Sequence, residues 1–259
     1  WDFATLGQLW MPPLCEFPGQ PEKVFMGGGA ETSGARIITL TYGGGSIGWE
    51  EGDFDFGEGD DGVAVSAIAY SPLRTDRLYV LTNDGRFFRS DNGGETWWKN
   101  ESFSAPEGHY FFGSSILPSP ISENVLWVAG SGYSNPPVFR SDDAGATFVE
   151  DWSGLPNTLV YDMACNQEGS LLFAATEVGP FIYVSGLETW YPMTGSPDQT
   201  YWSVEFVQPD NIARFGTYGR GIWDFRVDSV SAITEEEFPK PTKLSVQVSP
   251  NPFNSSTRI

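Results

Sequence analysis

One ten-residue pattern occurs twice in this chain, and it constrains the fold more than any other feature. The segments Phe88–Trp97 and Phe139–Phe148 both read as a short apolar strand followed by Ser-x-Asp-x-Gly-x-Thr and an aromatic residue, with Asn92 in the Asp position of the first copy. Their serines, Ser90 and Ser141, lie 51 positions apart. Recurrence at such a spacing is typical of folds that use one supersecondary unit several times.

Fainter copies bracket these two. Tyr183–Trp190 keeps the Ser and the Thr-Trp, and Thr41–Trp49 keeps the glycines and the aromatic residue. The first residues, Trp-Asp-Phe, resemble the later run Trp223–Phe225. The aromatic positions of the five copies are spaced by 39, 48, 51 and 42 residues: Trp10, Trp49, Trp97, Phe148 and Trp190. We expect these aromatic side chains to pack between sheets, where full burial contributes roughly 1.5–3 kcal/mol each.

The segments between the copies also repeat. Each has two short apolar runs joined by a turn, and a Gly-containing turn such as Asn83–Gly85 then leads into the strand before the motif, which is a strong hairpin signal. The first runs are Val65–Tyr70, Phe112–Leu117, Val160–Ala164 and Ser203–Val207, and the second are Leu78–Thr82, Val125–Ala129, Leu171–Ala175 and Ile212–Gly216. Four antiparallel strands per 40–50 residues predict an all-β chain, a β-propeller with about five visible blades.

Composition agrees with this fold and excludes some partners. The 30 glycines and 19 prolines indicate many turns and very little helix. A net charge of −20 argues against nucleic acid and against anionic membrane surfaces. No apolar run reaches membrane-spanning length, so we expect no membrane insertion.

The motif resembles the Asp-box (BNR) repeat of sialidase-like, xyloglucanase-like and sortilin-like propellers, and the run Gly216–Trp223 resembles their last-blade segment. The resemblance covers residues 1–228 and implies that the boxes are structural turns. The residues assigned to this structural role are Ser90, Asn92, Gly94, Thr96, Trp97, Ser141, Asp143, Gly145, Thr147 and Phe148.

The blade count predicts a longer ring. Residues 1–10 read as the last two strands of one blade, and five units follow them. We therefore expect further blades before Trp1 in a longer precursor, in a ring of roughly six to eight blades.

The tail has a separate character. Residues 229–243 form a charged, proline-containing linker, and residues 244–259 begin with an alternating apolar strand and then Ser249–Asn254, Ser-Pro-Asn-Pro-Phe-Asn. This run resembles the first strand of a type A C-terminal sorting domain. The resemblance implies export by the type IX secretion machinery of a Gram-negative bacterium to the medium or the outer cell surface, with a precursor that continues past Ile259.

The most acidic stretch, residues 50–62, holds seven carboxylates and no basic residue. It has two interpretations: a solvated acidic loop, or a calcium site in which glycines allow tight turning between oxygen ligands. The calcium hypothesis assigns the ligands to Asp53, Asp55, Asp60 and Asp61. The fold itself requires no cofactor.

Catalytic signals are weak. A glycosidase needs two carboxylates on opposite sides of a sugar, but no local motif singles out such a pair, and the Arg-Ile-Pro signature of sialidases is absent. The only histidine, His109, has no nucleophile motif beside it and is interpreted as a loop residue. Cys15 and Cys165 are compatible with either a disulfide or two free thiols.

Aromatic residues in predicted loops indicate a binding surface, because flat rings stack on sugars and anchor protein partners. The candidates are Tyr133, Tyr218 and Trp98. The sequence therefore favours a non-catalytic extracellular propeller that binds a protein or glycan ligand or takes part in a surface assembly. The alternative is an extracellular glycoside hydrolase acting on polysaccharide.

Overall fold

The computed structural model describes residues 11–29, 34–104, 113–133, 135–227 and 248–249. They form a β-propeller of five four-stranded antiparallel sheets, which confirms the predicted fold class. The first three sheets are β1–β4 (Leu14–Glu16, Lys23–Gly29, Ala35–Gly43, Ser46–Glu51), β5–β8 (Val65–Ser71, Arg74–Thr82, Arg86–Ser90, Trp98–Ser104) and β9–β12 (Ser115–Pro118, Leu126–Ala129, Val138–Ser141, Val149–Glu150). The others are β13–β16 (Val160–Cys165, Leu171–Thr176, Gly179–Val184, Thr189–Pro192) and β17–β20 (Tyr201–Val207, Ile212–Thr217, Ile222–Arg226, Val248–Ser249), with a short 3-10 helix, Gln208–Asp210.

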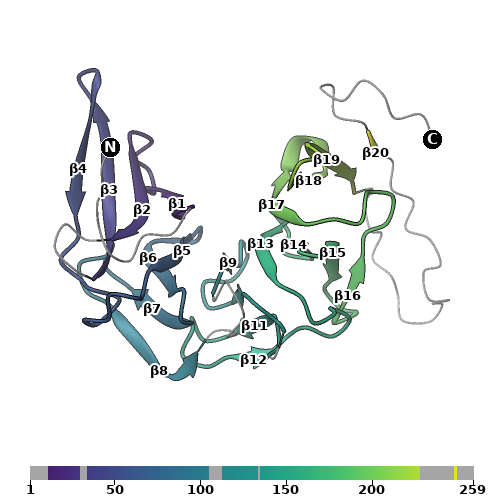
Figure 1. Ribbon diagram of the computed structural model, residues 1–259, viewed down its shortest axis with the longest axis horizontal. Coiled ribbons are helices and arrows are strands. Elements are labelled where there is room, and N and C mark those ends of the chain that lie inside the picture. Colours follow the sequence, from purple (N-terminus) through teal and green to yellow (C-terminus); the bar gives the residue numbers. More distant parts are fainter. Residues whose placement is uncertain (1–10, 30–33, 105–112, 134, 228–247, 250–259) are drawn as a thin grey trace.

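The sheets follow one another along an arc (Figure 1). The first strands of the sheets, β1, β5, β9, β13 and β17, lie on its concave side, and the outer strands β4, β8, β12 and β16 lie on its convex side. The sheets at the two ends of the arc do not meet. Within the described residues, no helix is long and apolar enough to cross a membrane.

Each space between neighbouring sheets is filled by one hydrophobic cluster that both sheets supply. The middle strand β14 shows how: Leu172 and Ala174 face the third sheet, whereas Leu171, Phe173 and Ala175 face the fifth. All five side chains are buried. Side chains alternate between the faces of a strand, so a continuous apolar run is what a sheet covered on both faces requires.

Hydrogen bonds along the concave side connect consecutive sheets. The Ser66 hydroxyl donates to the carbonyl of Gly113, 2.8 Å away, just before the third sheet. The Ser114 hydroxyl donates to the carbonyl of Val160 on β13. Neighbouring sheets are thus joined by hydrogen bonds as well as by apolar contact.

The two motif turns share one hydrogen-bond pattern. In the second, the Ser141 hydroxyl accepts the Gly145 N–H at 2.8 Å, and the Asp143 carboxylate accepts the Thr147 N–H at 2.7 Å. The turn Ser90–Trp97 repeats both bonds at 2.9 and 3.0 Å, with an asparagine oxygen in place of the carboxylate. An amide oxygen accepts a backbone N–H as a carboxylate does, so the Asn is compatible with the turn.

These turns also contact neighbouring sheets. Gly145 has φ +87°, and a Cβ atom there would lie 2.2 Å from the ring of Phe87 in the preceding sheet, so only glycine fits. The Phe148 ring packs edge-on against Phe87, with centroids 5.1 Å apart. Trp97 packs in the same way against Phe56, at 4.9 Å.

One predicted anchor does not pack between sheets. Trp49 lies on β4, opposite Leu40 on β3, and is 43% exposed. The β3–β4 connection is a two-residue hairpin turn at Gly44 and Gly45 instead of a motif turn, so the pairing continues to Gly43 and Ser46. Figure 1 shows this hairpin projecting beyond the rest of its sheet, which leaves its side chains without a neighbouring sheet to cover them.

Other features predicted from sequence are placed as follows. Val248–Ser249, in the tail, pairs with Phe225 and Asp224 of β19 as the fourth strand of the last sheet. The remainder of the tail, the first ten residues and His109 lie outside the described residues. Cys15 and Cys165 are free thiols, and burial raises their pKa values to about 12 and 11, which makes both poor nucleophiles near neutral pH.

Candidate functional site

Loops from three sheets meet at one end of the propeller. The β10–β11, β14–β15 and β18–β19 connections lie there together with the segments that enter β13 and β17. Backbone hydrogen bonds join them: the Gly132 N–H donates to Thr158 O at 2.8 Å, and the Glu177 N–H donates to Leu159 O at 3.0 Å. The Tyr218 N–H donates to Thr200 O at 3.1 Å. The first bond joins the loops of the third and fourth sheets, and the Thr200 hydroxyl, which donates to Glu177 O at 3.3 Å, joins those of the fourth and fifth.

Aromatic side chains cover this surface. Tyr218 is 76% exposed, and its ring centroid lies 6.1 Å from that of Trp202. The ring centroids of Trp202 and Tyr161 are 4.5 Å apart. Tyr133 is 43% exposed, and its hydroxyl donates to the carboxylate of Glu177. We call these five residues, Tyr133, Tyr161, Glu177, Trp202 and Tyr218, the loop face.

The bulges of two inner strands create part of the loop face. The pairing of β13 with β14 shifts register between Val160 and Asp162, and that of β17 with β18 shifts between Tyr201 and Ser203. The residues inside these shifts are Tyr161 and Trp202. A bulge re-aims a side chain away from the normal alternation, so both rings leave the blade core and reach the surface, while Tyr201 is fully buried.

Trp202 also carries an unsatisfied polar group. Its indole nitrogen is buried and has no hydrogen-bond partner in the described part of the chain. A buried donor without an acceptor costs about 1–3 kcal/mol.

Asp162, which the sequence did not single out, lies beneath the loop face on β13. Its carboxylate accepts the Val204 N–H at 3.0 Å and the Met163 N–H at 2.9 Å, and Ser115 on β9 donates to it at 3.4 Å. It therefore joins three inner strands. Removal from water raises its pKa to about 6, against the lowering effect of these hydrogen bonds.

The structure brings together two of the three predicted aromatic residues. Tyr133 and Tyr218 are connected through Glu177 and Thr200, whose hydroxyl donates to Glu177 O at 3.3 Å. Trp98 lies elsewhere, on the outer strand β8, where the Arg89 guanidinium sits 5.1 Å from its ring centroid. That contact is a cation–π pair within one sheet.

The acidic run organises its own backbone. The Asp55 carboxylate accepts three backbone N–H bonds of 2.9 Å, from Ala35, Gly57 and Gly59. These bonds lower its pKa, although desolvation acts in the opposite direction. Asp60 accepts the Gly62 N–H at 2.9 Å.

The four proposed calcium ligands do not form one cluster. Asp53 lines a small apolar hollow between the first two sheets, beside Phe54, and Asp61 is exposed. Among the residues that the structure describes, no three His, Cys, Asp or Glu side chains are grouped as a metal site would require. The calcium hypothesis stays a prediction.

Comparisons with known proteins identify the architecture. No protein-family model and no curated protein matches the chain. An ancestral GH74 enzyme is similar over 83% of this chain and 31% of its own length, with 18% identity and a TM-score of 0.61. The GH74 enzyme of Niastella koreensis is similar over 82% and 36%, with 17% identity and a TM-score of 0.62.

A third similar structure, YCF48, matches over 85% of this chain and 64% of its own length, with 12% identity and a TM-score of 0.58. The chain therefore spans less than two thirds of each of these proteins. At these identities the likeness shows the fold alone, a β-propeller.

Asp162 predicts a defined pH dependence of stability. Its pKa is about 6 in the folded chain and about 3.9 unfolded, so between these values the native state binds more protons. The free energy of unfolding should therefore fall as pH rises from about 4 to 6. Relative to Asp162→Asn, whose amide stays neutral, the wild type should lose stability across this window in urea unfolding. If the difference in unfolding free energy between the wild type and Asp162→Asn stayed constant from pH 4 to 7, the raised pKa of Asp162 would be contradicted.

Proposed function

We propose that this protein is a non-catalytic binding and assembly module whose loop face holds an extracellular protein segment or glycan. The observation that carries the proposal is the row of rings from Tyr161 through Trp202 to Tyr218, of which bulges turn the first two outward. Rigid aromatic side chains give a large contact area at low entropic cost.

Two further points support binding without turnover. The loop-face carboxylate, Glu177, accepts the Tyr133 hydroxyl, and Asp162 below it accepts backbone N–H groups, so both act as structural acceptors. YCF48, one of the similar structures, was solved bound to D1 peptide. A propeller of this shape therefore accommodates a peptide ligand in at least one other protein.

The binding role is part of a broader proposal for the chain. The two matching turns support an assignment to the Asp-box propellers, with the boxes in a structural role. The tail supports export by type IX secretion to the outer cell surface or the medium of a Gram-negative bacterium, and the net charge of −20 suits a soluble extracellular protein.

The second candidate function is glycoside hydrolysis. Asp162 favours it, because a carboxyl group with a pKa near 6 is suited to act as a general acid. Two of the similar structures are GH74 enzymes. The Asp162 carboxylate would then need a second carboxylate across the substrate.

A panel of soluble polysaccharides and a peptide array separates the two functions. We expect saturable binding to a member of one panel with no release of reducing ends, and at least a fivefold weaker affinity for Tyr218→Ala, since an exposed ring that anchors a ligand contributes about 1–3 kcal/mol. Tyr42→Ala, at an exposed tyrosine on the projecting hairpin, is the matched control and should bind normally. Release of reducing ends that Asp162→Asn abolishes would establish the hydrolase instead.

The export proposal has its own test. In the native host, replacing Pro250, Asn251 and Pro252 with alanine in the full-length gene should cause the protein to accumulate in the periplasm, because the sorting strand would lose its turn. Immunoblots of periplasmic and extracellular fractions measure this. Undiminished extracellular protein would show that the tail is not an export signal.

A further inference from the structure

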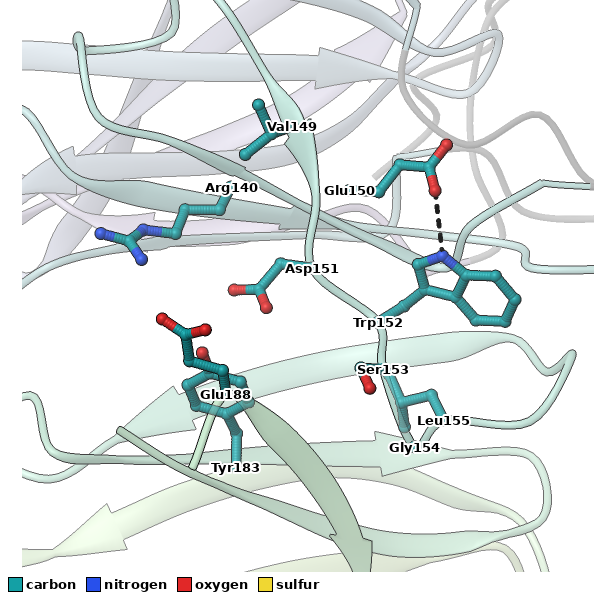
Figure 2. A pocket seen from close by; sticks show the side chains of 10 residues that line it. All are labelled: Arg140, Val149, Glu150, Asp151, Trp152, Ser153, Gly154, Leu155, Tyr183 and Glu188. Atoms are coloured by element: carbon teal, nitrogen blue, oxygen red, sulfur yellow. Dashed lines mark hydrogen bonds between the residues drawn. The ribbon is translucent and has the colours of Figure 1, made fainter. Parts of the chain in front are cut away.

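A pocket of about 530 Å³ opens between the third and fourth sheets, beside strands β11, β12 and β15. Figure 2 shows its walls: Arg140 from β11, the Val149–Leu155 segment that follows it, Tyr183 from β15, and Glu188 from the β15–β16 turn. It is built by residues that do not belong to the loop face. The pocket is therefore separate from the surface to which the proposed function is assigned.

Negative groups dominate the pocket. Three carboxylates line it, those of Glu150, Asp151 and Glu188, against one basic side chain, Arg140. That guanidinium is already paired with Asp142, which lies 2.6 Å away and outside the lining. The whole chain carries a net charge of −20, so its long-range field adds to the attraction for a cation.

The hydroxyl of Tyr183 is a polar group that is not used in the fold. Its side chain is 5% exposed and lines the pocket, yet its hydroxyl has no hydrogen-bond partner in the described structure. Burial and the nearby charges of Asp151 and Glu188 raise its pKa to about 12. The group is thus a neutral hydroxyl whose oxygen can accept a hydrogen bond from a ligand.

The two carboxylates beside Tyr183 differ in how they are held. Asp151 is fixed, since its side chain accepts the Trp127 indole N–H at 2.9 Å and its carbonyl accepts the Trp190 indole N–H at 2.9 Å. Glu188 has no hydrogen-bond or ion-pair partner among the described residues. Its backbone has φ +49°, an uncommon conformation for a residue other than glycine, in the turn that places it at the pocket.

We propose that this pocket binds a primary ammonium group. An ammonium has three N–H donors, and Asp151, Glu188 and Tyr183 offer three oxygen acceptors at one end of the pocket (Figure 2). Trp152, at the other end, provides an apolar surface for the methylene chain that carries the group.

The ligand is an organic cation and not a metal ion. Calcium requires six to eight oxygen ligands, whereas no three acidic, His or Cys side chains among the described residues are arranged to hold a metal. The ammonium can come from a lysine side chain of a partner protein or from a free polyamine. The two sources share the chemistry that the pocket recognises.

Titration of the 259-residue chain with Nα-acetyl-lysine-N-methylamide tests the proposal, with calorimetry as the measurement and the Nε-acetylated derivative as the neutral control. We expect saturable binding of the charged form and at least tenfold weaker binding of the neutral one. Spermidine, titrated in parallel, distinguishes the sources: tighter binding of the lysine derivative indicates a protein partner, and tighter binding of spermidine indicates a polyamine.

Two variants locate the site. Glu188→Gln removes the unpaired charge from an exposed turn residue and should weaken binding at least fivefold, and Tyr183→Phe should weaken it about threefold. Glu168→Gln, at another exposed turn of the same sheet, is the matched control and should bind as the wild type does. Absence of saturable binding, equal affinity for the acetylated form, or an unchanged affinity in Glu188→Gln would each overturn the proposal.

Discussion

The apolar clusters between neighbouring sheets are the interaction on which the rest of this structure depends. Each of the four clusters takes residues from two sheets, and the middle strands β6, β10 and β14 supply alternate side chains to the clusters on either side. Each buried aliphatic or aromatic side chain contributes roughly 1.5–3 kcal/mol. A one-residue slip of β14 would exchange its two faces, so mutual burial fixes the register as well as the stability.

Both candidate sites follow from this arrangement. The loop face exists because hydrogen bonds between the loops of three sheets hold them in one surface, and bulges turn Tyr161 and Trp202 outward. The pocket between the third and fourth sheets is lined by Arg140 of β11 and Tyr183 of β15, and Tyr183 also belongs to the apolar cluster that these two sheets share. The two candidate sites thus differ in origin, since one lies over the loops of the propeller and the other between two of its sheets.

Patterns that repeat along the sequence predicted the four-stranded sheets, whereas several residues of the two candidate sites were missed. Alternating apolar runs and Gly turns are local signals, so the four-stranded sheets and most strand bounds were accessible without a structure. Trp49 was misassigned because a Gly-Gly hairpin replaces the motif turn. The sequence did not single out Tyr161, which a bulge exposes, Asp162, which joins three sheets, or Glu188, which a turn conformation places at the pocket. A comparison of equivalent positions in the repeats would have marked Tyr161 and Trp202 as a pair.

Hydrogen exchange in Phe173→Ala is the most direct test of the claim that neighbouring sheets share their cores. Phe173 on β14 is fully buried and stacks on Phe206 of β17, with ring centroids 5.4 Å apart, and truncation should cost about 3–5 kcal/mol. The account predicts that amide protection falls together in β14 and in β18 of the fifth sheet. A loss confined to the sheet β13–β16, with β18 unchanged, would show that each sheet is stable on its own and would contradict the account.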